Sequence, residues 1–298
     1  MNTISKSISL LLTVLSLFSC KEEMEIDIEN GEKLIGIYGS ITTENIRHTV
    51  TVTRCADFYR SGTPEMIRNA DVYLIDNGND TIFYQEQKPG IYETKDILSG
   101  KEGHTYTLHV NISNDKGERQ EYTAEETLLE ATGPIDSIAV KPLKFNGKEI
   151  DDMFKVCPYL QSLEGKETSY LTKVAINGKM ISDTLTEYST FHLEGFAGMY
   201  INGKEMEELY DKDDFPQSVY NLNATKDDEK LQPNDLLTLY FYHISKDYSK
   251  YIEEIQNSSG SNPFFGSPSN VSSNILPKGR ALGFFYAASI VTGNLRIK

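Results

Sequence analysis

Alternating hydrophobic and polar residues run through most of this chain, and they predict short β-strands. Within residues 104–112 an apolar side chain occupies every second position, the spacing at which strand residues share one face. These residues are Tyr106, Leu108, Val110 and Ile112. Similar runs, rich in Val, Ile, Thr and Tyr, are separated by Gly, Asn and Asp. The pattern therefore indicates a mostly β fold.

The same criterion places strands in both halves of the chain. In the first half they are predicted at residues 33–40, 48–54, 71–76, 80–84, 104–112 and 120–126. In the second half they are predicted at 134–141, 154–160, 169–177, 236–245 and 282–291. Asn77-Gly78-Asn79 tolerates the positive φ angles of a tight turn, so it should join two strands in a hairpin.

Helical periodicity is confined to one clear segment. Tyr248, Tyr251, Ile252 and Ile255 recur at the spacing of one helix face, and Ser245 is placed to cap the helix N-terminus. Residues 187–234 are acidic and weakly periodic, and within them a short helix is predicted at 204–210.

Gly133-Pro134 interrupts the chain and suggests a domain boundary. Residues 33–132 are predicted to form an Ig-like or transthyretin-like β-sandwich. Residues 133–298 are predicted to form a second antiparallel β-rich domain with one or two short helices. The chain is long enough for each half to bury a core of its own.

The N-terminal residues predict export and a lipid anchor. Lys6 precedes an apolar run at 8–18 that is too short to span a membrane, so residues 1–19 are typical of a signal peptide. Leu17-Phe18-Ser19-Cys20 fits a bacterial lipobox, in which the cysteine thiol takes a diacylglycerol. Cys20 would then begin a lipidated tether of residues 20–32, and its acyl chains would hold the protein at the membrane. An ordinary cleaved signal with a chance cysteine is the alternative.

Lys21, Glu22 and Glu23 follow the predicted lipidation site. They resemble a short signal, a lysine followed by two acidic residues, that sends lipoproteins to the cell surface. The prediction is a lipid-anchored protein of the bacterial outer membrane that faces the exterior. A charged, solvated tether would have the same composition.

The net charge of −15 excludes nucleic acid as an expected partner. It would also repel anionic headgroups, so contact with the membrane is expected through the lipid on Cys20 alone. Apart from Cys20, the chain has Cys55 and Cys157. These two thiols can pair or remain free, and two buried free thiols are the favoured interpretation.

No motif for catalysis, cofactors or metal is present. The histidines lack an HExxH spacing, and no serine lies in GxSxG. The acidic runs 211–214 and 227–229 lack the EF-hand spacing, and the GxxxxGK at 198–204 is not followed by Ser or Thr. No catalytic residue, cofactor or metal ligand is therefore predicted.

Phe264 and Phe265 lie among polar, flexible residues. Two aromatic rings in such a loop either pack on the core or form a contact with a partner.

Several short motifs near the C-terminus resemble the domain of unknown function 4249 family. They are Tyr248-Ser249-Lys250-Tyr251, Asn262-Pro263-Phe264-Phe265, Ser273-Asn274-Ile275 and Gly283-Phe284-Phe285-Tyr286-Ala287-Ala288. The resemblance implies a Bacteroidetes envelope lipoprotein encoded beside TonB-dependent transporters. It supplies no catalytic residues.

Three functions remain open from the sequence. The first is a non-catalytic binding or accessory subunit of a TonB-dependent uptake system. The second is an adhesive or structural surface lipoprotein. The third is an unrecognised hydrolase, which predicts a cleft with convergent carboxylates of shifted pKa.

Overall fold

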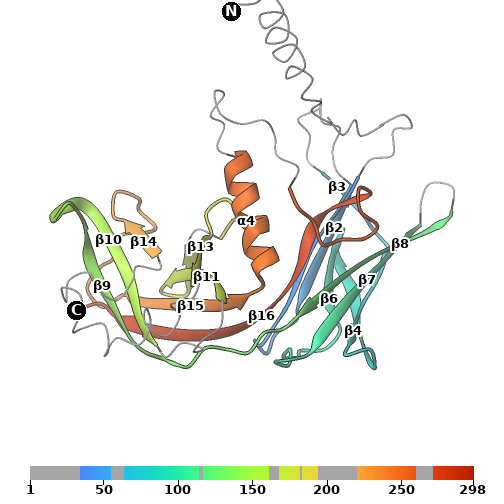
Figure 1. Cartoon of the computed structure of the whole chain (residues 1–298), viewed down its shortest axis with the longest axis horizontal. Coiled ribbons are helices and arrows are strands. Elements are labelled where there is room, and N and C mark those ends of the chain that lie inside the picture. Colours follow the sequence, from blue (N-terminus) through green and yellow to red (C-terminus); the bar gives the residue numbers. More distant parts are fainter. Residues whose placement is uncertain are drawn as a thin grey trace, which may run out of the picture. The chain divides into compact units, whose positions relative to one another are not determined.

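Strands make up most of the chain that the structure describes, and the described part contains a single helix (Figure 1). The computed structural model describes residues 34–54, 64–113, 117–160, 168–181, 183–193, 220–259 and 271–298. The predicted mostly β class is confirmed. The Ig-like or transthyretin-like topology of the first half stays a prediction.

The strands of the first half are β1 (Ile35–Thr42), β2 (Thr49–Arg54), β3 (Glu65–Met66), β4 (Asp71–Asp76), β5 (Asp80–Lys88), β6 (Ile91–Thr94), β7 (Thr105–Ser113) and β8 (Arg119–Thr127). The second half contains β9 (Ile135–Phe145), β10 (Lys148–Leu160), β11 (Thr168–Ile176), β12 (Lys179–Ile181), β13 (Ser189–Leu193), β14 (Tyr220–Asn223), β15 (Leu236–Ile244), α4 (Lys246–Ser259) and β16 (Ala281–Arg296). Every strand predicted from the sequence is found. Asn77 and Gly78 take positive φ angles in the hairpin between β4 and β5, as predicted.

The strands missed from the sequence are short ones, such as β6, which has four residues. Runs of this length show too few alternations for a period of two to be recognised. β6 is a strand because its neighbours, β2 and β5, form backbone hydrogen bonds with it.

One large sheet extends through both halves of the sequence. Its strand order is β12-β11-β15-β16-β1-β2-β6-β5-β4-β7-β8, with β13 on β11 and β3 on β2. A second sheet has the order β14-β10-β9. Residues 34–298 belong to one compact unit. The boundary suggested at Gly133 falls in the strand-free connection between β8 and β9, and the division into domains 33–132 and 133–298 stays a prediction.

Strand β16 joins the two halves, because its first part pairs in parallel with β1 and its later part pairs with β15. The sequence predicted antiparallel neighbours only. Alternate side chains of β16 enter different cores. Phe285 belongs to the core of the first half, whereas Phe284 and Tyr286 face helix α4. Figure 1 shows β16 as the long red strand that links the two regions.

The segment 271–276 brings β8 next to β16. Thr123 and Leu276 exchange backbone hydrogen bonds with N···O distances of 3.1 and 2.7 Å. The side-chain amide of Asn274 accepts from the backbone N–H of Phe285 at 3.0 Å and donates to its carbonyl at 2.7 Å. Asn274 and Leu276 therefore bridge β16 and β8 beside the first core.

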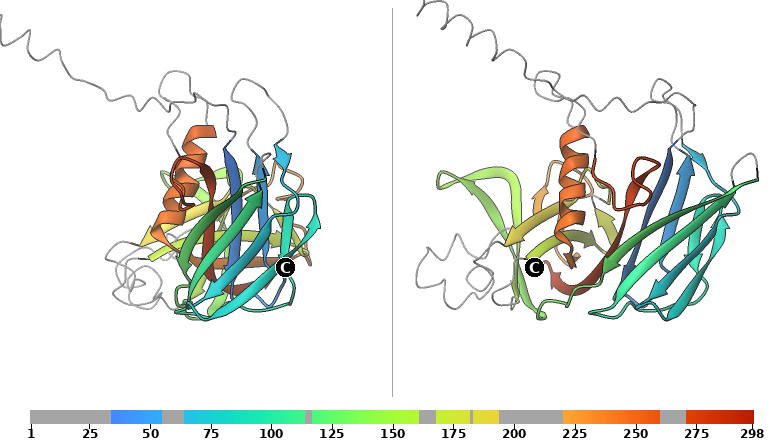
Figure 2. Two further views of the ribbon diagram at one scale, coloured as in Figure 1. Left: turned by 90° about the vertical axis from the view of Figure 1, so that its right-hand side faces the viewer. Right: turned by 45° about the vertical axis from the view of Figure 1, so that its right-hand side comes forward.

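Helix α4 packs against the large sheet (Figure 2). Tyr248, Tyr251 and Ile252 are buried, as the helical periodicity predicted. The hydroxyl of Ser245 accepts a hydrogen bond from the backbone N–H of Tyr248 at 3.2 Å, so it caps the helix as predicted. Among the described residues, no helix has the length and apolar character required to cross a membrane.

Candidate functional site

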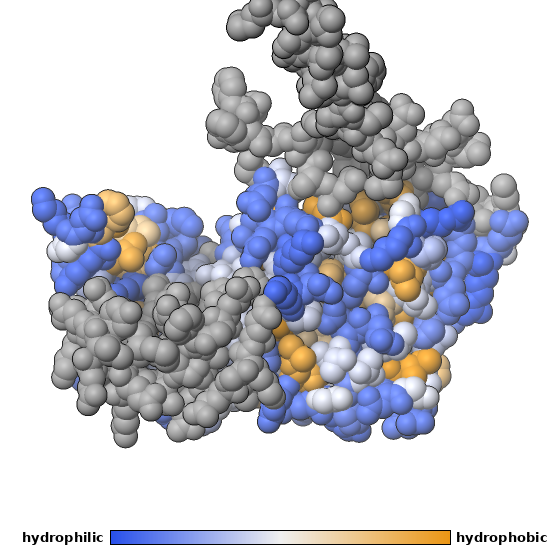
Figure 3. Space-filling model, in the orientation of Figure 1, coloured by the Kyte–Doolittle hydropathy of each residue, from blue (hydrophilic) through white to orange (hydrophobic). Residues whose placement is uncertain are grey.

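The β9–β10 hairpin carries the most exposed aromatic side chain of the described chain. Its tip is Asn146-Gly147, both with positive φ, which suits a two-residue turn. Beside the turn, Phe145 is 69% exposed and Ile150 is 39% exposed. Figure 3 shows apolar residues at the outer end of this hairpin, surrounded by hydrophilic ones. Exposed apolar groups in a polar surround are a common feature of binding surfaces.

A large bulge interrupts the hairpin just inside the tip. Glu149 pairs with Lys144 and Phe154 pairs with Pro142, so residues 150–153 of β10 face a single residue of β9. Asp152 has φ of 60°, an uncommon angle for a residue other than glycine. Its carbonyl accepts the backbone N–H of Ala224 at 2.7 Å. The bulge therefore fixes the loop that follows β14 against the hairpin.

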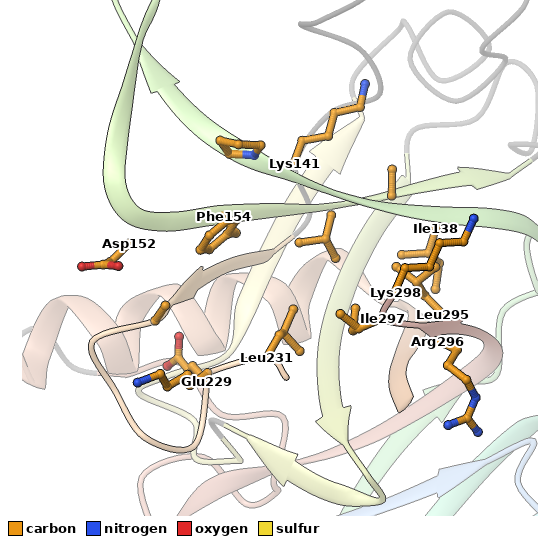
Figure 4. A pocket seen from close by; sticks show the side chains of 15 residues that line it. Ile138, Lys141, Asp152, Phe154, Glu229, Leu231, Leu295, Arg296, Ile297 and Lys298 are labelled. Carbon is orange, nitrogen blue, oxygen red and sulfur yellow. The ribbon is translucent and has the colours of Figure 1, made fainter. Parts of the chain in front are cut away.

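An apolar cavity of about 670 Å³ lies beside this bulge. The hairpin, the loop after β14 and the end of β16 line it. The lining residues are Ile138, Ala139, Val140, Lys141, Pro142, Asp152, Phe154, Ala224, Glu229, Lys230, Leu231, Leu295, Arg296, Ile297 and Lys298. Figure 4 shows Phe154, Leu231 and Ile297 directed into the space between these elements, while the charged ends of Lys141 and Arg296 extend away from it.

The charges of the cavity lining are unusual for so acidic a chain. Four of the lining side chains are cationic and two are acidic. One of the acids, Glu229, is buried and already engaged, because its carboxylate accepts the backbone N–H of Asn223 at 2.6 Å and the Nζ of Lys226 at 2.7 Å. This contact raises the pKa of Lys226. The charged part of the lining therefore has an excess of positive groups.

The lining of the cavity is mainly apolar. Burial raises the pKa of Glu126 to about 7 and raises the pKa of Glu44, but neither carboxyl lines the cavity. In the parts of the chain that the structure describes, no group of three or more His, Cys, Asp or Glu side chains could hold a metal ion. A half-open apolar pocket of this size can hold the apolar part of a ligand.

The four histidines whose side chains the structure describes have separate structural partners. His48 Nε2 contacts the carbonyl of Leu98 at 3.1 Å, and burial lowers its pKa. The Nδ1 atoms of the others contact acceptors on neighbouring segments: His104 with Asp76 at 2.5 Å, His109 with Glu121 at 2.9 Å and His243 with the Glu130 carbonyl at 2.6 Å. The side chain of His192 lies outside the described residues. These contacts stabilise strands and loops.

Lys173 forms a polar cluster with Asp183 and Tyr188 beneath α4. The ammonium group of Lys173 contacts Asp183 and the hydroxyl of Tyr188, both at 2.8 Å. It also lies 4.3 Å from the centre of the Tyr188 ring. The side chain of Lys173 is only 10% exposed, and its partners connect the loop before β13 to the sheet. We interpret this group as a structural tether.

All the site residues predicted from the sequence lie outside the described residues: Cys20, Lys21, Glu22, Glu23, Phe264 and Phe265. The signal peptide, Cys55 and the helix predicted at 204–210 also lie outside them. Cys157 is a buried free thiol, and burial raises its pKa. The aromatic residues Phe241 and Tyr242 of β15 lie in the core.

The sequence did not reveal the cavity, because its lining comes from four distant stretches of chain. These stretches are 138–142, 152–154, 224–231 and 295–298. The one local signal was Asn146-Gly147, which marks the hairpin that forms one wall. The bulge between Glu149 and Phe154 has no comparable sequence pattern.

The fold and the cavity describe a mostly β protein with an apolar pocket beside a hairpin. The chain belongs to the family described as domain of unknown function (DUF4249), whose model matches residues 21–294. The family assignment made from the C-terminal motifs is therefore confirmed. A search of curated proteins gives no match to this chain.

Solved structures give weak similarities. One is to a Ca²⁺-stabilised adhesin that helps an Antarctic bacterium reach out and bind ice, with 12% identity, a TM-score of 0.23, and coverage of 72% of this chain and 45% of that chain. Another is to a structure concerned with host cell surface retention of a 1.5-MDa bacterial ice-binding adhesin. Here identity is 11% and the TM-score 0.23, with coverage of 89% of this chain and 65% of that chain. The chain thus spans less than two thirds of each of these structures, and neither similarity carries an argument about function.

Proposed function

We propose that this protein is a lipid-anchored, non-catalytic binding subunit at the bacterial outer membrane that accompanies a TonB-dependent transporter. The observation that carries the binding role is the apolar cavity beside β9–β10, with its bulged wall and charged periphery. The predicted lipobox at Cys20 supports the anchor. The family resemblance supports the link to a transporter.

In this proposal, the cavity holds a ligand and Phe264 with Phe265 contact the transporter. Aromatic side chains between polar residues suit a contact of this kind, because a partner can cover them. Lys21, Glu22 and Glu23 direct the lipoprotein to the outer face of the membrane.

The test is affinity purification of the tagged protein from its native envelope in mild detergent, followed by mass spectrometry. We expect a TonB-dependent transporter at near-stoichiometric yield. Phe264→Ala with Phe265→Ala should reduce that yield at least fivefold. The matched control is Phe83→Ala, which removes an aromatic side chain that is 51% exposed on β5 and should leave the yield unchanged.

Recovery of the lipoprotein alone, at wild-type expression, would contradict the accessory role. It would favour the adhesive or structural interpretation, which predicts affinity for surface glycans and no stable transporter partner.

A further inference from the structure

We infer that the β9–β10 cavity binds the hydrocarbon tail of a single-chain anionic amphiphile, of which a long-chain fatty acid is the simplest example. This inference rests on the binding role proposed above and specifies its ligand. It depends on the shape, the apolar centre and the charged periphery of the cavity.

The centre of the cavity suits a hydrocarbon chain. Phe154, Leu231 and Ile297 point into it, and they continue the buried cluster that contains Val156 and Leu222 (Figure 4). A sugar or a peptide backbone would lose its hydrogen bonds to water there, because these side chains offer none in return. A hydrocarbon chain loses no hydrogen bonds and gains contact with apolar walls.

The volume of about 670 Å³ lies within the range typical of small-molecule sites. The walls are held in place before any ligand binds. The Asp152 carbonyl bonds the Ala224 N–H, and Glu229 fixes the turn around Asn223 and Lys226. A site formed in advance avoids the entropic cost of ordering a loop around the ligand.

The periphery suits a negative headgroup. Lys141, Lys230, Arg296 and Lys298 line the cavity, and Lys230, Arg296 and Lys298 are exposed to solvent. Arg296 also donates to the carbonyl of Asn234 at 2.8 Å, which fixes its position without neutralising its charge. In a chain of net charge −15, this local excess of cations is the opposite of the surrounding charge. An anionic headgroup is therefore attracted to the mouth of this cavity and repelled elsewhere.

The experiment compares two amphiphiles that share a tail and differ in the sign of the headgroup. Laurate and dodecyltrimethylammonium are titrated below their micelle concentrations into the full mature chain carrying Cys20→Ala, purified without detergent. Binding is measured by isothermal titration calorimetry at low and moderate salt. We expect saturable 1:1 binding of laurate, at least tenfold tighter than dodecyltrimethylammonium, with the difference reduced by salt.

Variants separate the tail site from the headgroup site. Ala224→Phe places a ring in the cavity and should abolish binding of laurate while the thermal unfolding temperature stays near the wild-type value. Lys230→Glu with Lys298→Glu should weaken laurate binding at least fivefold. The matched control Lys88→Glu reverses an exposed charge on β5, away from the cavity lining, and should leave laurate binding unchanged.

Several outcomes would overturn the inference. Equal affinity for the two amphiphiles would show that the negative charge of the headgroup is not recognised. Laurate binding that is unaffected by Ala224→Phe would show that the ligand binds outside this cavity. If laurate binds only after residues 194–219 are replaced by a Gly-Ser linker, the natural occupant of the cavity would be that segment of the protein and not an amphiphile. If laurate fails to bind while the transporter still copurifies, this inference falls and the accessory role stands. The opposite result, in which laurate binds and no transporter copurifies, would support this inference and contradict the accessory role.

Discussion

Gly283 of β16 pairs with Ile37 of β1. Its φ is +105°, and a Cβ atom added there would lie 1.9 Å from the carbonyl oxygen of Ile37. Since the obstacle is backbone, no side-chain rotation can relieve the contact. Gly283→Ala should therefore lower the free energy of unfolding by about 3 kcal/mol or more, measured by urea denaturation.

Gly279→Ala is the matched control for this change. Gly279 also has a positive φ, +79°, but nothing lies within 4 Å of its added Cβ. Gly279→Ala should lower the free energy of unfolding by only about 1 kcal/mol, because the strain of the backbone angle is its only cost. Equal losses in the two variants would show that the approach of β16 to Ile37 is unimportant.

Glu126, at the end of β8, makes stability depend on pH. Burial, aided by the charge of Asp247, raises its pKa to about 7, although hydrogen bonds from Ser245 and Asn274 oppose the shift. In the unfolded chain the carboxyl titrates near 4.5. Between these values the folded protein keeps a proton that the unfolded chain has released. This group therefore lowers the free energy of unfolding as pH rises from about 4.5 to about 7.

Glu126→Gln removes this ionisation. At pH 8 the variant should be more stable than the wild type by about 2 kcal/mol, and at pH 4.5 the two should be similar. Thermal and urea unfolding at both pH values measure the difference. Glu125→Gln, at the exposed neighbouring position, should show no such dependence on pH, and an equal effect there would contradict the assignment.

At the scale of elements, α4 is held to the sheet by stacked and hydrogen-bonded tyrosines. The rings of Tyr248 and Tyr286 stack with centroids 4.1 Å apart, and the hydroxyls of Tyr248 and Tyr38 lie 2.6 Å apart. Burial raises the pKa values of Tyr38 and Tyr248 well above the usual range, so both hydroxyls stay protonated and available as donors at neutral pH. This contact joins α4 directly to β1.

A double-mutant cycle tests the contribution of that hydrogen bond. Tyr248→Phe should cost about 1 kcal/mol of unfolding free energy, and Tyr38→Phe should cost little more once Tyr248 is already Phe. Tyr251→Phe, on the same helix, keeps the Tyr38–Tyr248 bond and serves as the control. Strictly additive losses for Tyr38→Phe and Tyr248→Phe would contradict a coupled pair.

At the scale of the whole molecule, β16 contributes to the cores of both halves. Phe285 lies in the first core, Tyr286 lies under α4, and Val291 packs against the core beside β9–β10. Disruption of β16 therefore removes packing from all three. We expect one cooperative transition in differential scanning calorimetry, with equal calorimetric and van't Hoff enthalpies. Two separate transitions would instead support independent domains divided near Gly133.

The proposed membrane attachment also belongs to the scale of the whole molecule. Cys20→Ala removes the thiol that the predicted lipobox requires, so the protein should leave the membrane fraction and appear in the soluble fraction. Fractionation with detection of the tagged chain measures this. Cys157→Ala is the control, since that thiol is buried in β10 and should not affect location. Continued membrane association of Cys20→Ala would contradict the lipid anchor.

Local sequence determined the elements of this protein. Alternation at 104–112 gave β7, the i, i+3, i+4, i+7 spacing after Ser245 gave α4, and Asn77-Gly78 gave a hairpin, because each pattern reflects how neighbouring residues share a face or a turn. The C-terminal motifs also gave the family.

Tertiary structure alone decided how the elements combine. The parallel pairing of β1 with β16 joins residues about 250 positions apart, and no local pattern encodes such a partner. The cavity depends on the same long-range assembly, since Phe154, Leu231 and Ile297 meet only after β10, the loop after β14 and the end of β16 are in place. Periodicity records which face of a segment is apolar, whereas the surface that covers this face is selected by packing across the whole chain.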